Sequence, residues 1–450
     1  MVLAAGQGTR MRSALPKVLH PLAGRPLIAY PLALARRLDA AAVAVVHAPG
    51  QQDQLAPVDP AATMVPQADP RGTGDALNRV PPELRGHTEV LVLYGDVPLL
   101  TQATLTALVA MRRYEGLDGV LLAARVRDPH GYGRVVHEAH GPRIVEEADA
   151  TPEIAAVNLV NTGVCCFRAA ALWPLLADLV PSAATGELYL TDVFGRLRQR
   201  AVLECPEEEA LGINDRAQLA AAEAVLRRRI NRGLQLAGVT IRDPETTWID
   251  AAVRIGQDTV IEPFSFLRGD TEIGAGCHIG PFAEITDSRV GDHVEVGRSH
   301  LVEAVLEEGV RLGPFNRLRP GSRIGAGVRI GNFAEIKNST VGPDSDVHHF
   351  SYLGDAVLGR GVNIGAGTVT ANYDGVAKHR TVIGDHVFIG TDSTLIAPVR
   401  VGDGAYTAAG SVISRDVAPG ALAIERGEQR EVADWTRRRR RPPAEPGQAP

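Results

Sequence analysis

A six-residue repeat that begins near residue 250 constrains the fold more than any other feature of this chain. Aliphatic residues stand at every sixth position in three blocks, which are Ile255, Ile261, Leu267, Ile273, Ile279 and Ile285; Leu306, Leu312, Leu318, Ile324, Ile330 and Ile336; and Ile383, Ile389, Leu395 and Val401. Because six is a multiple of two, each aliphatic side chain points to the same side of a short strand. Three such strands per turn predict a triangular parallel β-helix of roughly ten coils, with about 18 residues in each coil.

The repeat also predicts what fills the prism and where it is interrupted. A small or β-branched residue stands four places after many of the aliphatic ones, as at Thr259, Ser265, Cys277, Ala283, Val328 and Ala334. Small interior residues of this kind explain why aromatic residues make up only 4% of the chain. The step shortens to five from Ile285 to Val290 and from Ile336 to Val341. The pattern is lost over Thr370–Thr381, which we expect to form a loop that leaves the coil.

Residues 1 to 215 have a different pattern, in which short apolar runs alternate with helix-like stretches. Residues 42–47, 89–93 and 119–124 have the continuous apolar character of buried strands, whereas residues 28–40 and 102–113 carry apolar residues at helical spacing. This alternation predicts a mostly parallel sheet covered by helices. Residues 216–236 favour a helix that connects the two parts.

Composition and charge narrow the functional class. The net charge of −6 gives no reason to expect nucleic acid or an anionic membrane surface as a partner. We find no export signal and no apolar run of the roughly 18 residues that a membrane helix needs, so we expect no membrane association. The four cysteines lack CxxC spacing, and we expect them to be reduced and buried in a cytoplasmic protein. The tail, which includes Arg437–Arg441, is expected to be disordered.

The first motif with chemical content opens the chain, from Leu3 through Gly6, Gly8 and Arg10 to Lys17. Glycines at these positions let several backbone N–H groups face one point, which suits a triphosphate, and the two cations add mobile positive charge. The motif is not a Walker loop, because GxxxxGK[ST] is absent. Asp96 follows the apolar run of residues 90–94, and we therefore expect it at the carboxyl edge of the sheet, where ligands bind.

The opening string resembles the nucleotidyltransferase signature of sugar-nucleotide pyrophosphorylases. Further segments match that signature, and they are Gln67 with Gly72-Thr73-Gly74, Tyr94-Gly95-Asp96, Gly131-Tyr132-Gly133-Arg134, Ile144-Val145-Glu146, Asn161-Thr162-Gly163 and Gly212-Ile213-Asn214. Together with the hexapeptide repeat, the chain resembles the bacterial bifunctional N-acetylglucosamine-1-phosphate uridyltransferase and glucosamine-1-phosphate acetyltransferase family from residue 3 to about residue 426. The fold expected is an α/β Rossmann-like nucleotidyltransferase domain over residues 1–215, a linker helix over 216–238, a left-handed parallel β-helix over 239–426 and a tail over 427–450.

The resemblance implies a first site in which UMP passes from UTP to N-acetylglucosamine-1-phosphate, with release of pyrophosphate. It implies catalytic roles for Arg10 and Lys17 on the phosphates, and a Mg²⁺ ion held by Asp96 and Asn214. The remaining nucleotide and sugar contacts implied by the family are Leu3, Ala4, Gly6, Gln67, Gly72, Thr73, Gly133, Glu146 and Asn161. Taken alone, Asp96 could also be a turn residue, and Glu146 could be an exposed charge at a strand end. We expect Cys165 and Cys166 to be core residues.

A second site is expected in the β-helix, where polar and charged residues stand at positions for which the repeat predicts no functional side chain. Arg319 and Lys337 are 18 residues apart, so they stack on successive coils and could bind a sugar phosphate, although a solvated charged face explains them too. The resemblance implies glucosamine-1-phosphate contacts at Arg319, Lys337, Tyr352, Asn363 and Lys378, and acetyl-CoA contacts at Asn372, Tyr373, Thr391, Ala409 and Arg426. It makes His349 the general base for direct attack of the amine on the thioester, with His348 a bystander.

The family also implies a homotrimer whose acetyl sites are shared between chains, and a role in cell wall synthesis. Two other interpretations remain open at this point. One is a nucleotidyltransferase with a single activity and a purely structural solenoid, and the other is a non-enzymatic regulatory scaffold. The presence of His349, Lys337 and Asn363 argues against the first interpretation. The presence of Lys17, Asp96 and His349 argues against the second, because a scaffold without activity would be expected to lose such residues.

Overall fold

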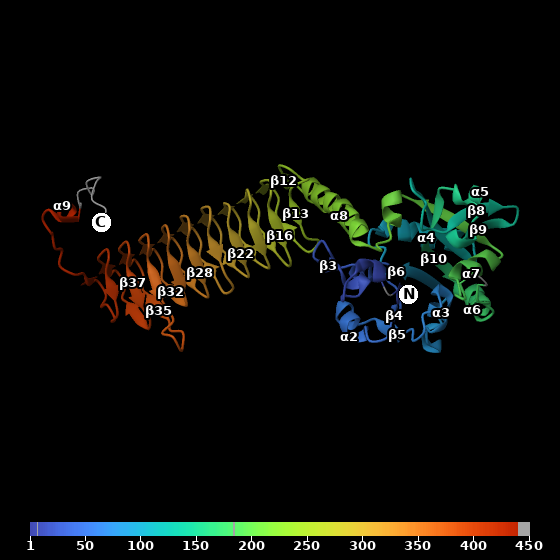
Figure 1. The fold of residues 1–450 in the computed structure, drawn as a ribbon, viewed down its shortest axis with the longest axis horizontal. Helices are drawn as coiled ribbons and strands as arrows, with labels where there is room; N and C mark the ends of the chain where they lie inside the picture. Colours follow the sequence, from blue (N-terminus) through green and yellow to red (C-terminus); the bar gives the residue numbers. More distant parts are fainter. Residues whose placement is uncertain (7, 183–184, 440–450) are drawn as a thin grey trace, which may run out of the picture. The chain divides into compact units, whose positions relative to one another are not determined.

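The computed structural model describes residues 1–6, 8–182 and 185–439, and it divides into two compact units (Figure 1). The first unit contains Met1–Leu236 and Trp248–Val253, and the second contains Ala237–Thr247 and the chain from Arg254 onward. Helices and a sheet make up the first unit, whereas short strands stacked in coils make up the second. None of the helices in the described residues is long and apolar enough to cross a membrane.

The first unit is built on one twisted sheet with the strand order β11-β7-β10-β6-β1-β4-β5. Its strands are β1 (Val2–Ala4), β4 (Ala44–His47), β5 (Thr63–Pro66), β6 (Glu89–Tyr94), β7 (Gly119–Arg125), β10 (Leu159–Arg168) and β11 (Arg200–Cys205), with the hairpin β8 (Arg134–Glu138) and β9 (Gly141–Val145) attached to β10; β2 (Pro21–Leu22) and β3 (Arg25–Pro26) form a separate small hairpin. The strands predicted over residues 42–47, 89–93 and 119–124 are confirmed as β4, β6 and β7.

The expectation of a mostly parallel sheet is confirmed, since β11, β7, β6, β1, β4 and β5 all run in one direction, while β10 runs antiparallel between β6 and β7. The chain leaves β7, forms the β8–β9 hairpin and returns through the middle of the sheet in the opposite direction. The apolar run at the end of β10, which includes Cys165 and Cys166, is buried, as expected for core cysteines. An apolar run predicts that a strand is buried but carries no information on its direction, so the sequence pattern does not distinguish the two cases.

Helices cover both faces of this sheet. The helices are α1 (Ala29–Arg37), α2 (Gln52–Leu55), α3 (Thr73–Asn78), α4 (Gln102–Tyr114), α5 (Pro152–Ala155), α6 (Ala169–Ala177), α7 (Leu190–Arg196) and α8 (Arg216–Leu236), with short 3-10 turns η1 (Thr9–Met11), η2 (Lys17–Leu19), η3 (Ala56–Val58), η4 (Pro82–Leu84), η5 (Glu147–Asp149) and η6 (Glu207–Ala210). One core joins the sheet to α3, α6 and α7, and another joins it to α1 and α4. Helix α8, predicted over these residues, packs through Ala222 and Val225 on Leu27 and Ile213.

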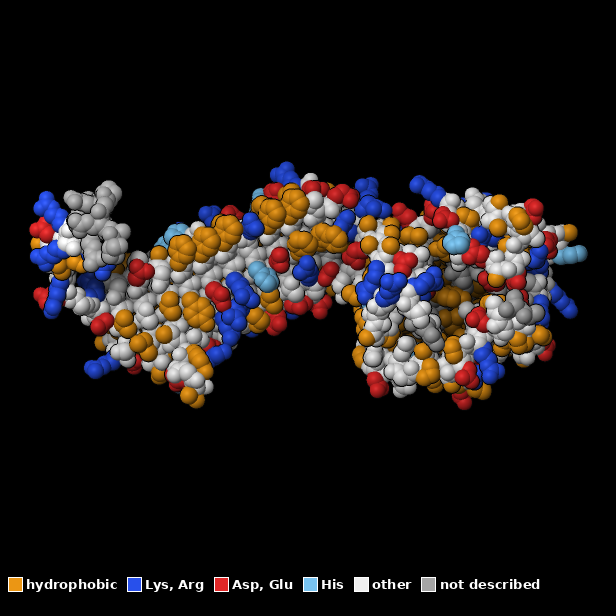
Figure 2. Space-filling model, in the orientation of Figure 1, with side chains coloured by type: hydrophobic (Ala, Val, Ile, Leu, Met, Phe, Trp, Pro, Cys, Tyr) orange, Lys and Arg blue, Asp and Glu red, His pale blue; other side chains and the backbone are white. Residues whose placement is uncertain are grey.

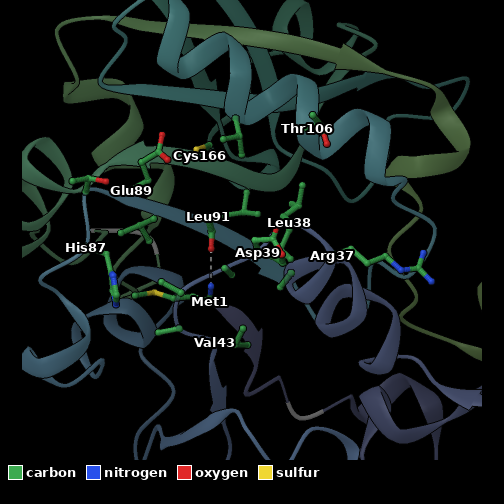
Figure 3. A pocket seen from close by; sticks show the side chains of 18 of the residues that line it. Met1, Arg37, Leu38, Asp39, Val43, His87, Glu89, Leu91, Thr106 and Cys166 are labelled. Atoms are coloured by element: carbon green, nitrogen blue, oxygen red, sulfur yellow. Dashed lines mark hydrogen bonds between the residues drawn. The ribbon is translucent and has the colours of Figure 1, made fainter.

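A cavity of about 770 Å³ opens where β1 begins, between β4 and β6 (Figure 3). Strand β1 pairs with β6 only at Leu93 and Tyr94, although β6 starts four residues earlier at Glu89. The ammonium group of Met1 donates to the carbonyl oxygen of Leu91 at 2.7 Å, and burial lowers the pKa of this amine to about 5. The cavity therefore lies at the amino edge of the parallel strands, on the opposite side of the sheet from the expected ligand edge.

The second unit is a parallel β-helix with three sheets, which confirms the fold predicted from the hexads. The first sheet contains β12 (Thr240–Ile241), β15 (Val260–Ile261), β18 (His278–Ile279), β21 (Glu295–Val296), β24 (Arg311–Leu312), β27 (Arg329–Ile330), β30 (Asp346–Val347), β33 (Asn363–Ile364), β36 (Phe388–Ile389), β39 (Tyr406–Thr407) and β41 (Leu422–Ala423). The second sheet of this unit contains β16 (Phe266–Arg268), β19 (Glu284–Thr286), β22 (His300–Val302), β25 (Arg317–Leu318), β28 (Glu335–Lys337), β31 (Tyr352–Gly354), β34 (Val369–Ala371), β37 (Thr394–Ile396) and β40 (Val412–Ile413). The short strand β13 (Trp248–Ile249) belongs to the first unit. The third sheet contains β14 (Arg254–Ile255), β17 (Glu272–Ile273), β20 (Arg289–Val290), β23 (Val305–Leu306), β26 (Arg323–Ile324), β29 (Thr340–Val341), β32 (Ala356–Leu358), β35 (Thr381–Ile383) and β38 (Val399–Val401).

The interior of the β-helix is filled as the repeat predicts. The small residues expected inside the prism are all buried, and they are Thr259, Ser265, Cys277, Ala283, Val328 and Ala334. The hydroxyl of Thr259 donates to the carbonyl oxygen of Gly274 at 2.8 Å, so its burial leaves no donor unpaired. The five-residue steps appear as coils shortened to 17 residues, since Ile273 pairs with Val290 and Ile324 with Val341. The predicted loop is confirmed between β34 and β35.

Aromatic side chains form a ladder on one outer edge of the β-helix instead of filling its interior. The ladder contains Phe264, Phe282, Arg298, Phe315, Phe333 and Phe350, and the ring centroids of stacked neighbours are 4.9–5.1 Å apart. The Arg298 guanidinium lies 5.0 Å from the Phe282 ring and 5.3 Å from the Phe315 ring, and thus takes the place of a ring. Figure 2 shows hydrophobic side chains in rows along this unit.

The described part of the tail ends in a short helix, α9 (Trp435–Arg439). The prediction of a disordered tail over 427–450 concerns a segment that is described only in part. Residues 440–450, and with them the end of the arginine run Arg437–Arg441, lie outside the described residues.

Candidate functional site

Three predicted residues from distant parts of the chain meet at the carboxyl edge of the sheet in the first unit. The Lys17 ammonium group donates to an Asp96 carboxylate oxygen at 2.5 Å and to the Asn214 amide oxygen at 3.1 Å. Asp96 lies two residues after Tyr94, the last residue of β6. The Ile213 N–H donates to the Asp96 carbonyl oxygen at 2.9 Å, and this bond holds the loop before α8 at the same edge of the sheet. Lys17 and Asp96 are both mostly shielded from solvent. The result is a charged cluster where parallel strands end.

Gly8, in the glycine-rich segment that follows β1, lies close against this cluster. Gly8 has φ +59°, and a Cβ atom there would lie 2.6 Å from the Lys17 Cβ, so the close approach requires glycine. Leu3 and Ala4 are buried at the end of β1, whereas Gly6 and Arg10 are exposed. Arg10 makes no ion pair with any of the described residues, which leaves its guanidinium available to an incoming anion.

A buried hydrogen-bond network contains the predicted Gln67, Gly72 and Thr73. The Gln67 amide donates to an Asp75 carboxylate oxygen at 2.8 Å and to the Gly72 carbonyl oxygen at 3.2 Å. The Thr73 hydroxyl accepts from the Leu190 N–H at 3.0 Å. Gly72 has φ +98°, and a Cβ atom there would lie 2.6 Å from a backbone oxygen, so this turn also requires glycine. These contacts hold the segment in one conformation beside the sheet.

The predicted sugar-binding residues Gly133, Glu146 and Asn161 also come together. The Asn161 N–H donates to the Gly133 carbonyl oxygen at 2.8 Å, and a Cβ atom on Gly133 would lie 3.2 Å from a Glu146 carboxylate oxygen. Burial raises the pKa of Glu146, although a hydrogen bond at 2.9 Å from the Thr191 hydroxyl works in the opposite direction. A half-buried carboxylate among small residues can accept hydrogen bonds from sugar hydroxyl or amide groups.

The donor atoms at the Lys17 cluster suit Mg²⁺, although the described residues contain no group of three or more acidic, histidine or cysteine side chains that could hold a metal. One carboxylate and one amide oxygen converge on the point that the Lys17 ammonium group now occupies. Magnesium commonly binds through one or two protein oxygens together with substrate phosphates and water. The pair Asp96 and Asn214 therefore fits a metal that arrives with a nucleotide.

In the second unit, the predicted phosphate-binding cations lie on neighbouring strands of the second sheet. Leu318 pairs with Ile336, so Arg319 and Lys337 stack one coil apart, as the 18-residue spacing predicts. The Arg319 guanidinium contacts a Glu335 carboxylate oxygen at 2.8 Å. The nearby Lys378 ammonium group lowers the pKa of Lys337. Close cations of this kind form a site for an anion such as a phosphate.

Asp355 anchors the loop between β34 and β35 to this cationic group. Its carboxylate accepts hydrogen bonds at 2.5 Å from the side chains of Asn338 and Asn372. Burial alone would raise the pKa of Asp355, but these two hydrogen bonds and the charges of Lys378 and Lys337 lower it. Tyr373 and Lys378 face each other across the base of the loop, and Tyr373 is 61% exposed.

A corner row, defined as Asn332, His349, Ala366, Thr391 and Ala409, runs along one edge of the β-helix on successive coils. Each coil is joined to the next by a backbone hydrogen bond, because the N–H groups of Gly367, Asp392 and Gly410 donate to the carbonyl oxygens of His349, Ala366 and Thr391 at 2.7–2.9 Å. Arg426 continues the row, with its side chain 4.0 Å from the Cβ position of Gly410. Coil register thus aligns the predicted base His349 with three of the predicted acetyl-CoA contacts.

Asn363 is not brought to the cationic group within the chain. It lies on β33 in the first sheet, whereas Arg319, Lys337 and Tyr352 belong to the second sheet or follow its strands directly. Its amide oxygen instead contacts His348 Nε2 at 3.0 Å. His348, predicted to be a bystander, therefore contacts one of the predicted sugar-phosphate residues.

Sequence reasoning missed several residues that contact the predicted ones, among them Thr191, Asp355 and Asn332. Thr191 donates to Glu146, Asp355 accepts from Asn372, and Asn332 contacts His349. The 17-residue separation of Asn332 and His349 is one short coil, so coil arithmetic could have found that pair. Thr191 and Asp355 stand in segments without a repeat that would relate them to their partners.

Comparisons with known proteins agree with this two-part organisation. A MobA-like NTP transferase domain model matches residues 1–189, and a bacterial transferase hexapeptide model with six repeats matches residues 252–287, 303–338 and 380–415. Curated relatives named "Bifunctional protein GlmU" match along nearly the whole chain. The protein from Pelobacter propionicus is 45% identical with 97% of each chain covered, and that from Kineococcus radiotolerans is 48% identical with 97% of this chain and 91% of the relative covered.

A third relative of the same name, from Desulfitobacterium hafniense, is 42% identical over 98% of this chain and 99% of its own length. Identity at this level over both units covers the nucleotidyltransferase and hexapeptide parts together. The chain is therefore an enzyme with two transferase activities, and it belongs to the bifunctional GlmU family.

Proposed function

We propose that this protein makes UDP-N-acetylglucosamine in two steps carried out at its two sites. It acetylates glucosamine-1-phosphate with acetyl-CoA and then transfers UMP from UTP to N-acetylglucosamine-1-phosphate, releasing pyrophosphate. We assign uridylyl transfer to residues 1–215 and acetyl transfer to residues 239–426, joined by the helix over 216–238. The observation that carries the proposal is the convergence of Lys17, Asp96 and Asn214 at one sheet edge, together with the alignment of His349 in the corner row.

In uridylyl transfer, a phosphate oxygen of the sugar phosphate attacks the α-phosphorus of UTP in line with the bond to pyrophosphate. Lys17 and Arg10 offset the charge on the phosphates. Leu3, Ala4 and Gly6 contribute to the frame around the uridine. Gln67, Gly72 and Thr73 frame the uridine, and Gly133, Glu146 and Asn161 hold the amino sugar. Asp96 and Asn214 would hold a Mg²⁺ ion, which would supply positive charge to offset the negative charge of the phosphates.

In acetyl transfer, the amine nitrogen of glucosamine-1-phosphate attacks the thioester carbonyl of acetyl-CoA directly. Arg319, Lys337, Tyr352, Asn363 and Lys378 bind the sugar phosphate, while Asn372, Tyr373, Thr391, Ala409 and Arg426 bind acetyl-CoA. The C–N bond forms and the C–S bond of the thioester breaks, while His349 takes the proton that the amine loses and returns it to the departing sulfur, so that coenzyme A leaves as the thiol. The separation of Asn363 from the cationic group supports a homotrimer in which neighbouring chains complete each acetyl site.

We propose that both reactions take place in the cytoplasm and serve cell wall synthesis. The four cysteines are all free, which suits a reducing compartment.

The two activities can be separated by single substitutions in the full-length protein. His349→Ala should abolish acetyl transfer and leave uridylyl transfer intact, and His348→Ala serves as the matched control one residue away. Asp96→Ala should remove Mg²⁺-dependent uridylyl transfer only. Release of coenzyme A and of pyrophosphate measures the two reactions, with dTTP offered against UTP to test uracil recognition. Loss of both activities in a folded His349→Ala protein, or unchanged turnover in Asp96→Ala, would contradict the assignment.

A further inference from the structure

The imidazole of His349 packs against Gly331 and Asn332 of the preceding coil. His349 follows β30, and its ring Nδ1 contacts the amide oxygen of Asn332, which follows β27 one coil earlier. A Cβ atom on Gly331 would lie 3.0 Å from the ring Nδ1 and 3.2 Å from the ring Cε1. A side chain at Gly331 would therefore crowd the ring, which would have to shift by a few tenths of an ångström to remain beside Asn332.

The contact with Asn332 constrains which ring nitrogen of His349 carries the proton. An amide oxygen can only accept a hydrogen bond, so a neutral imidazole satisfies it by holding its proton on Nδ1. The opposite tautomer would set the Nδ1 lone pair against the amide oxygen. With the proton on Nδ1, the Nε2 lone pair is free, and this is the form that a general base needs in order to accept a proton.

The corner row places His349 in line with the residues proposed to bind acetyl-CoA, where a general base is needed. His349 is exposed within the chain, and it is aligned with Thr391 and Ala409, the residues proposed to contact acetyl-CoA. Its neighbour His348 contacts Asn363 instead, and the two imidazole centroids are 6.2 Å apart. The two adjacent histidines therefore have different partners, and only His349 has its Nδ1 fixed by an acceptor from the preceding coil.

We propose that Asn332 is a positioning residue, which holds His349 in the Nδ1-protonated tautomer and leaves Nε2 to take the proton of the attacking amine. The proposal rests on the proposed role of His349 as the base. Asn332 itself makes no contact with the reacting atoms. It acts by fixing the orientation and the protonated nitrogen of another side chain, as residues that support a catalytic histidine do in other enzymes.

Two substitutions of nearly equal size test the proposal in the full-length protein. Asn332→Leu removes the acceptor and should lower kcat for acetyl transfer by roughly 10–100-fold, with little change in the KM for either substrate. Asn332→Asp keeps an acceptor at the same place and should retain most of the activity. Uridylyl transfer and the Tm should be unchanged in both proteins. A purely structural role would instead lower the Tm, or would make the two substitutions equally harmful.

The results also separate this proposal from the proposed function. If His349→Ala retained acetyl transfer, the role of the base would be wrong. If His349→Ala were inactive but folded Asn332→Leu kept kcat within about twofold of the parent, only the role of Asn332 would be overturned. In the His349→Ala background, Asn332→Leu should cause no further loss.

A direct readout of the ring does not depend on either substitution at Asn332. In protein labelled with ¹⁵N-histidine, the neutral His349 ring should give the ¹⁵N shifts of the Nδ1-protonated tautomer, with the signal assigned by its absence in His349→Gln. A neutral ring protonated on Nε2 would refute the proposal.

Discussion

Lengthening β1 at its amino end should stabilise the first unit, and the gain should be largest in acid. The cavity at Met1 holds an α-amino group that is buried between β4 and β6. Burial lowers the pKa of this group from 8.0 to about 5, because the charged form loses its hydration. When the unfolded chain carries the proton, folding has a free-energy cost, because the amine must either lose its proton or be buried with its charge.

The sign and size of the effect follow from linkage. Between pH 5 and pH 8 the unfolded chain holds this proton and the folded chain does not, so the free energy of unfolding rises with pH across that window. The penalty is fully present below about pH 5 and absent above about pH 8. At about 1.4 kcal/mol per pH unit, it reaches at most about 4 kcal/mol. For a unit of this size that corresponds to a Tm difference on the order of 10 °C.

The perturbation is the insertion of two valines after Met1. An even number preserves the alternation of side chains along β1, and it moves the amine outward by roughly 7 Å. Insertion of Asp-Gly is the matched control, because it moves the amine equally far but adds no apolar side chain to fill the cavity. We expect both insertions to remove the part of the pH dependence that the buried amine causes, and the valines to raise the Tm further at every pH.

The assay is thermal unfolding at pH 5.5 and pH 8, after intact mass has confirmed that Met1 is retained. The quantity of interest is the difference between the two Tm values, compared between the parent and each insertion, because other titrating groups cancel in that comparison. If the parent and the Asp-Gly protein showed the same difference, the buried amine would not be the cause and the reasoning would be refuted.

Three further predictions concern single side chains. Lys17→Met should lower kcat for uridylyl transfer by roughly 10²–10³-fold without affecting acetyl transfer, as measured by pyrophosphate and coenzyme A release; similar losses in both would argue against a local role. Because burial raises the pKa of Glu146, the folded state binds the extra proton and stability should fall as pH rises above the ordinary glutamate value of 4.5. Glu146→Gln should remove this slope in thermal unfolding and raise the KM for the sugar phosphate, and an unchanged slope would count against it. Arg298→Ala should cost about 1–2 kcal/mol through its two ring contacts, with Arg298→Phe restoring the loss of Tm; equal Tm values for the parent and Arg298→Ala would show that the ladder contributes nothing there.

The sequence was most informative in the β-helix, where the six-residue repeat matches the two-residue alternation of side chains along a strand. In the β-helix, the hexad of aliphatic residues fixes both the face that each strand buries and the coil in which it lies. The 18-residue spacing of Arg319 and Lys337 therefore predicted their stacking. The five-residue steps, which the sequence shows, correspond in the structure to coils shortened to 17 residues. The loop that carries Lys378 was visible because the repeat stops there.

The sequence was less informative where position depends on long-range topology. The direction of β10 could not be predicted, because its apolar run packs equally well in either orientation. The meeting of Lys17 with Asn214 across 197 residues follows from the sheet and the loop before α8, and no local pattern encodes it. It was expected only from the family resemblance. The partners of Glu146 and Asn372 were missed for the same reason.

The corner row places its residues at regular intervals along the axis of the β-helix. Parallel strands repeat at about 4.8 Å, so the three coil steps from His349 to Ala409 span roughly 14 Å, and Arg426 lies about one step beyond. An elongated thioester lying along this edge would have its reactive end fixed by which coil it reaches. Deleting the coil between Ala366 and Thr391 would leave the remaining coils stacked, yet it would remove Asn372, Tyr373 and Lys378 and would bring Thr391 and Ala409 one full step closer to His349.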